Sequence, residues 1–76
     1  MFFDSTTVIN RGWDAVLANA QNAEFQAVDR NKLSQIVKTH STNRYPAWAD
    51  WSAIKKDLHR NYGDRVAEKL VYSMLG

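Results

Sequence analysis

The segment Tyr45–Tyr62 most constrains the fold, because its apolar residues recur at the spacing of an α-helix. On a helix of 3.6 residues per turn, four large side chains share one stripe: Trp51, Ile54, Leu58 and Tyr62. Lys56 and Arg60 fall on the opposite side. We therefore predict a core helix with a basic outer face, beginning either at Pro46 or after an N-cap at Asp50.

Three further segments show the same helical period. They are expected at residues 5–20, 30–40 and 65–74, each after an aspartate that can accept hydrogen bonds from free amides of the first turn: Asp4, Asp29 and Asp64. Gly63 ends the preceding helix in this scheme, because glycine adopts positive φ without strain. The predicted buried positions are Val8, Ile9, Trp13, Val16, Leu17, Ala20, Leu33, Ile36, Val37, Val66, Ala67, Leu70, Val71 and Met74.

Some positions allow more than one interpretation. Residues 21–28 either continue the first helix or form a loop fixed by Phe25. Gly12 lies within an apolar helix face, where glycine costs about 1 kcal/mol relative to alanine, so we expect another element to approach closely there. Phe3 and Trp48 are expected to cover the ends of the core.

The predicted fold class is all-α: a small, compact bundle of three to four helices forming one domain over residues 1–76. No run of alternating β-branched residues reaches strand length, and no repeat is present. The chain has 76 residues and no cysteine, so disulfides cannot supplement the core. Three Trp, three Tyr and three Phe residues must carry much of the burial instead.

The absence of cysteine is typical of a reducing compartment. No apolar run approaches the roughly 18 residues that span a bilayer, and the N-terminal residues lack the features of a signal peptide. We therefore expect a cytoplasmic protein without membrane association.

The residues that most often carry catalysis are few and scattered. His40 continues an apolar stripe and is expected to form a hydrogen bond at the edge of the core. His59 lies among basic residues and suits solvent or an anion better than general-base work. No nucleophile motif, glycine-rich phosphate loop or converging set of metal ligands appears. The sequence therefore predicts no enzyme activity, no cofactor and no metal.

The net charge of +2 conceals an asymmetry along the chain. Residues 1–29 hold one basic and four acidic side chains, whereas residues 30–76 hold nine basic and four acidic ones. This is either ordinary solvated helix surface or a basic surface for an anionic partner.

Tyrosine, tryptophan and arginine are enriched where proteins bind each other, so we expect a protein interface among basic and aromatic residues. The candidates for partner binding are Arg44, Tyr45, Lys56, Arg60 and Tyr72. The expected function is that of a small, non-catalytic intracellular protein docking on the acidic surface of a larger protein as an inhibitor, adaptor or regulator. Such proteins are common among bacterial and phage accessory proteins. Either a monomer or a homodimer is compatible with this expectation.

The alternative is a small basic nucleic-acid-binding protein that contacts phosphates. Its candidate residues are Lys55, Lys56, His59, Arg60, Arg65 and Lys69. Two helices meeting near Gly63 have the spacing of a helix-turn-helix, but the second would present Asp64 and Glu68 close to the phosphates, which opposes binding.

Overall fold

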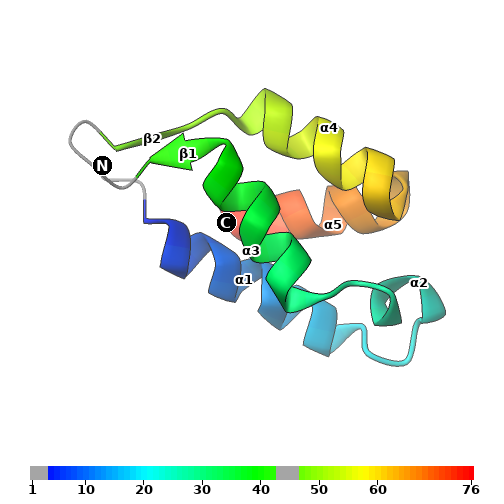
Figure 1. The fold of residues 1–76 in the computed structure, drawn as a ribbon. Coiled ribbons are helices and arrows are strands. Elements are labelled where there is room, and N and C mark those ends of the chain that lie inside the picture. The colour runs from blue at the N-terminus through cyan, green and yellow to red at the C-terminus, as the bar shows by residue number, and fades with distance from the viewer. Residues whose placement is uncertain (1–3, 43–46) are drawn as a thin grey trace.

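Five helices form the part of the chain that the computed structural model describes, residues 4–42 and 47–76. They are α1 (Ser5–Ala18), α2 (Ala23–Gln26), α3 (Arg30–Thr39), α4 (Trp51–Tyr62) and α5 (Asp64–Leu75). Both α5 and α3 pack against α1 and against α4, so the four long helices form a ring in the order α1–α5–α4–α3 (Figure 1). This arrangement confirms the all-α bundle.

Aspartates begin three of the long helices. The carboxylates of Asp4, Asp29 and Asp50 accept hydrogen bonds from backbone amides two or three residues later, at 3.0, 3.0 and 3.1 Å. These bonds satisfy amides that have no partner within the helix. The caps at Asp4 and Asp29 confirm the sequence prediction. Of the two proposed starts for α4, the structure has the one after Asp50.

The junction between α4 and α5 differs from the prediction at one residue. Gly63 has positive φ, at 83°, as expected where a helix ends without a connecting loop. The prediction that Asp64 caps α5 is wrong, because Gly63 is the N-cap and Asp64 is the first helical residue. The Asp64 carboxylate instead lies 2.6 Å from Nδ1 of His59, on the last turn of α4.

The segment between α1 and α3 is not a continuation of α1. The helix α1 ends at Ala18, and Asn22 begins the short helix α2 by accepting a hydrogen bond from Glu24 N at 2.9 Å. Phe25 of α2 is fully buried. The interpretation of a connection fixed by Phe25 is therefore the one that the structure supports.

Two short strands, which the sequence did not predict, connect α3 to α4. β1 (Ser41–Thr42) and β2 (Trp48–Ala49) pair antiparallel, with Ser41 opposite Ala49. Strands of two residues are too short to show a periodicity in the sequence. The pairing of β1 with β2 is therefore visible only in the structure, where the end of α3 lies near the start of α4. Trp48 is 53 % exposed, so the prediction that it covers the core is wrong. Phe3 lies outside the described residues.

The core lies inside the ring and contains all the predicted apolar positions of α3 and α5. From α4 it contains Ile54 and Leu58, while Trp51 and Tyr62 are partly buried and pack against it. The buried face of α1 also includes Ala15, which was not predicted, because α5 packs against α1. Leu17, which was predicted to be buried, is 56 % exposed, and Ala20 lies exposed beyond the end of α1. A Cβ on Gly12 would lie 3.1 Å from Met74 and 3.3 Å from Leu33, which confirms the predicted close approach.

Candidate functional site

Positive charge is concentrated on two neighbouring helices. Together α3 and α4 carry six Lys and Arg residues and one acid, Asp57, whereas α1 and α5 together carry three basic and three acidic residues. Because α3 is next to α4 in the ring, their shared side is basic (Figure 1). The shared side of α1 and α5 lies opposite and is neutral. We call Lys32, Lys38, Lys56, Arg60 and the groove between them the α3–α4 face.

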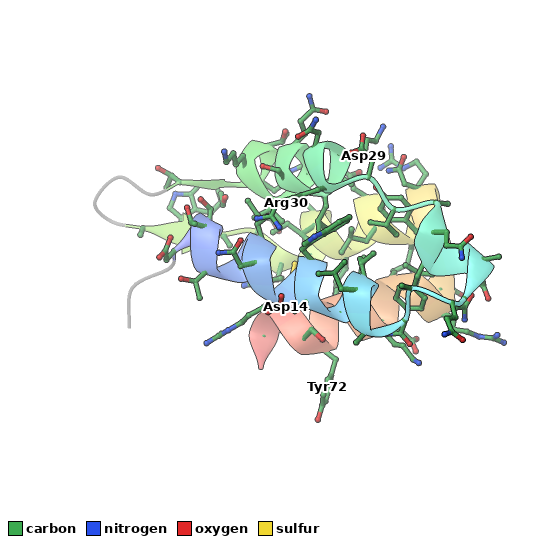
Figure 2. The ribbon with its side chains drawn as sticks, turned by 90° about the horizontal axis from the view of Figure 1, so that it is seen from below. Asp14, Asp29, Arg30 and Tyr72 are labelled. Atoms are coloured by element: carbon green, nitrogen blue, oxygen red, sulfur yellow. The ribbon has the colours of Figure 1, made fainter. Side chains whose placement is uncertain are left out.

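Several cations outside this face are held by intramolecular partners. Arg65 Nη1 lies 3.4 Å from Glu24 Oε1, and Lys69 Nζ lies 3.5 Å from Asn19 Oδ1. Arg30 donates to Asn10 of α1 and lies over the Trp13 ring, 5.8 Å from its centroid (Figure 2). These contacts fasten α2 and α3 to the bundle, so the charges concerned are less available to another molecule.

The cations without such partners lie mainly on α3 and α4. Within residues 4–42 and 47–76, five Lys or Arg side chains have neither a hydrogen bond nor an ion pair: Arg11, Lys32, Lys38, Lys55 and Lys56. Four of the five belong to α3 and α4. The unpaired positive charge is therefore concentrated on one side of the bundle.

A groove of about 300 Å³ separates α3 from α4. It is lined by Lys32, Gln35, Ile36, Thr39, Asp57, Arg60 and Asn61. Within it, Asp57 Oδ2 lies 2.6 Å from His40 Nε2, and Asp57 Oδ1 accepts a hydrogen bond from Arg60 Nη2 at 2.6 Å. The side chain of His40 is 24 % exposed, which confirms the expectation of a hydrogen-bonded histidine at the edge of the core.

These neighbours favour the ionised form of Asp57. The hydrogen bond from His40 lowers the pKa of the Asp57 carboxyl below 3.8, and the charges of Arg60 and Lys32 act in the same direction against partial desolvation. A carboxyl whose pKa is lowered by folding stabilises the fold above its unfolded pKa. This contribution is lost as the pH falls through the lowered pKa.

We expect Asp57→Asn to reduce the acid sensitivity of the protein. As the pH falls below the ordinary pKa range of an aspartate, the free energy of unfolding of the wild type should fall more steeply than that of the variant, because only in the wild type does unfolding allow this carboxylate to take up a proton. Urea unfolding at a series of pH values measures the difference. Asp14→Asn is the matched control, since Asp14 is exposed and has no ion-pair partner among the described residues. Parallel pH profiles for the wild type and Asp57→Asn would contradict this assignment.

The residues predicted to bind a protein partner do not form one surface. Lys56 and Arg60 are exposed one turn apart on α4. Tyr72 is 82 % exposed and points away from α5 beside a different groove, between α1 and α5, which Ala15 and Ala18 also line (Figure 2). Arg44 and Tyr45 lie outside the described residues.

The residues predicted to bind nucleic acid are mostly engaged within the protein. Four of the six have intramolecular contacts: His59, Arg60, Arg65 and Lys69. Lys55 and Lys56 remain unpaired in the described part of the chain. Lys32 and Lys38 of α3, which share the basic face with α4, were not among the predicted site residues. Their only sequence signal was the excess of basic residues after residue 29.

No group of three or more His, Asp or Glu side chains in the described ranges is placed to hold a metal ion. None of the helices described is long and apolar enough to cross a membrane. Comparisons with protein-family models, with curated proteins and with solved structures found no match to this chain.

Proposed function

We propose that the protein is a small, non-catalytic intracellular binding protein that docks through its α3–α4 face on an acidic surface of a larger protein. There it acts as an inhibitor, adaptor or regulator. One observation carries the proposal: four of the five unpaired cations in the described ranges lie on α3 and α4, whose only acid already has two intramolecular partners. Positive charge that the fold does not neutralise is available for an anionic partner.

Docking of this kind combines long-range attraction with a few anchoring contacts. The lysines of the α3–α4 face raise the rate of encounter, and salt weakens this effect. Arg44 and Tyr45 belong to the residue types that most often anchor interfaces, and in the sequence they lie between β1 and β2, which connect α3 to α4. We therefore keep both among the proposed partner-binding residues, together with Lys56 and Arg60.

The test is capture of partners from a host lysate by immobilised wild-type protein and by charge-reversal variants. Lys56→Glu with Arg60→Glu should reduce capture of an acidic protein by about tenfold or more, because the variant repels the surface that the wild type attracts. Arg11→Glu with Lys69→Glu is the matched control, since both residues are exposed on α1 and α5, away from the α3–α4 face. If the two double variants capture the same partners in the same amounts, the α3–α4 face is only solvated surface.

Nucleic-acid binding is the competing outcome, and the internal contacts of His59, Arg65 and Lys69, three of its six candidate residues, weigh against it. Fluorescence anisotropy with a random-sequence DNA duplex distinguishes nucleic-acid binding from protein docking. Phosphate binding is the function if the protein binds the duplex with micromolar affinity at low salt, if added salt weakens this binding steeply, and if Lys55→Glu with Lys56→Glu abolishes it. Protein docking is then rejected. Light scattering on the same samples decides between monomer and homodimer.

A further inference from the structure

The groove of the α3–α4 face contains Arg60, whose guanidinium is bonded to Asp57 and is otherwise exposed to solvent. Both carboxylate oxygens of Asp57 are used, one by His40 and one by Arg60, each at 2.6 Å. Asp57 is 23 % exposed, whereas the Arg60 side chain is 72 % exposed. The guanidinium is therefore anchored by a mostly covered carboxylate while much of it faces solvent.

Arg60 has further N–H donors that the contact with Asp57 does not use. A guanidinium has five N–H groups in a rigid plane, and the contact with Asp57 is made through Nη2. From the opposite wall of the groove, Lys32 adds a second positive charge, close enough to act on the Asp57 carboxyl. Gln35, on the same wall as Lys32, has a side-chain amide without a hydrogen-bond partner among the described residues. The groove thus offers two cations and an amide to one further anionic group.

We propose that the groove receives a carboxylate side chain of the acidic partner between Arg60 and Lys32, with His40 and Asp57 as positioning residues that orient the guanidinium. This inference rests on the proposed function and names the group that the docking site recognises. An arginine that is already oriented loses less conformational entropy on binding than a free one, and its planar donors match the two oxygens of a carboxylate.

The lining of the groove favours a protein carboxylate over a nucleic acid. Asp57 lies within the groove and would repel successive phosphates placed along it. None of the lining residues is aromatic, so the groove offers no surface on which bases stack. A single carboxylate needs no stacking surface, and it meets Arg60 and Lys32 at one point, where their two positive charges exceed the one negative charge of Asp57.

The test is a titration of the full chain with a capped six-residue glutamate peptide at low salt, followed by amide chemical shifts in NMR. We expect the shifts to change for residues 32–39 and 57–61. Arg60→Lys should weaken binding about tenfold, because lysine keeps the charge but loses the planar pair of donors. Lys32→Ala should weaken binding several-fold. Lys38→Ala is the control, because it removes the same charge from α3 without altering the lining of this groove.

A separate pair of variants tests whether His40 positions Arg60 through Asp57. His40→Phe removes the donor to Asp57 and should weaken peptide binding several-fold, whereas His40→Gln, which keeps a donor, should restore most of it. If His40→Phe does not fold, Arg60→Lys and Lys32→Ala still decide the carboxylate site. Equal effects of His40→Phe and His40→Gln in folded protein would overturn the positioning role.

The carboxylate site and the proposed function can fail independently, and the variants distinguish these failures. If Arg60→Lys and Lys32→Ala bind the peptide as Lys38→Ala does, the carboxylate site is wrong. The proposed function then stands if Lys56→Glu with Arg60→Glu still reduces capture of the protein partner about tenfold or more. If a random-sequence duplex perturbs the same amides more strongly than the peptide does, both are overturned in favour of phosphate binding.

Discussion

Replacing Phe25 with alanine is expected to lower the free energy of unfolding by about 3–5 kcal/mol, the usual cost of truncating a fully buried phenylalanine. Phe25 has no exposed surface and comes from α2, a helix of four residues that cannot be stable on its own. Small domains have total stabilities near the lower end of about 5–15 kcal/mol, so the variant should be close to unfolding at room temperature. Urea unfolding followed by circular dichroism measures the loss.

Leu17→Ala is the matched control for Phe25→Ala. It also truncates a large apolar side chain in this part of the chain, but Leu17 is 56 % exposed and should lose less than about 1 kcal/mol. Equal losses for Phe25→Ala and Leu17→Ala would show that α2 does not pack into the core as described.

Replacing Gly12 with leucine is expected to destabilise the bundle by about 1–3 kcal/mol or more, because the new side chain has no room. Even a single Cβ at this position would lie 3.1 Å from Met74 Cγ and 3.3 Å from Leu33 Cδ2. The larger side chain must therefore push α1 away from α5 and α3, which lowers the thermal midpoint.

Two variants test whether lack of space is the cause. Gly12→Ala should change stability little, since the better helix propensity of alanine, about 1 kcal/mol, opposes the tight contact with Met74. Combining Gly12→Leu with Met74→Ala should recover part of the loss, because the shortened side chain makes room for the leucine. If the double variant is as unstable as the sum of the single variants, the two residues are not in contact.

The helices that could be predicted from sequence are those specified by neighbours in the chain. The stripe of Ile54 and Leu58 and the possible cap at Asp50 depend on residues three or four positions apart, so local pattern predicts α4, although it left the start open between Pro46 and Asp50. Where two elements compete for the same residues, the local pattern was not enough. Gly63 took the cap position that Asp64 could have filled, since α4 and α5 meet without a loop.

Some features of the candidate site could likewise be predicted from the sequence, and others could not. The exposure of Lys56 and Arg60 follows from helical spacing. Whether a cation is free depends on partners distant in sequence, as in the contacts of Arg65 with Glu24 and of Lys69 with Asn19, 41 and 50 residues apart. The pairing of His40 with Asp57 likewise joins the residue after α3 to α4, 17 residues away in the sequence. No local spacing reports any of these contacts.

The sequence by itself determined that the chain is helical, where α1 and α3 begin, and that positive charge follows residue 29. Each of these depends on a residue type or on a spacing within one or two helical turns. The tertiary structure decided which charges the fold neutralises, that α3 and α4 share one basic side, and that Tyr72 lies on the opposite side. These properties depend on which helices pack together, because ion pairs and grooves form between elements and not within them.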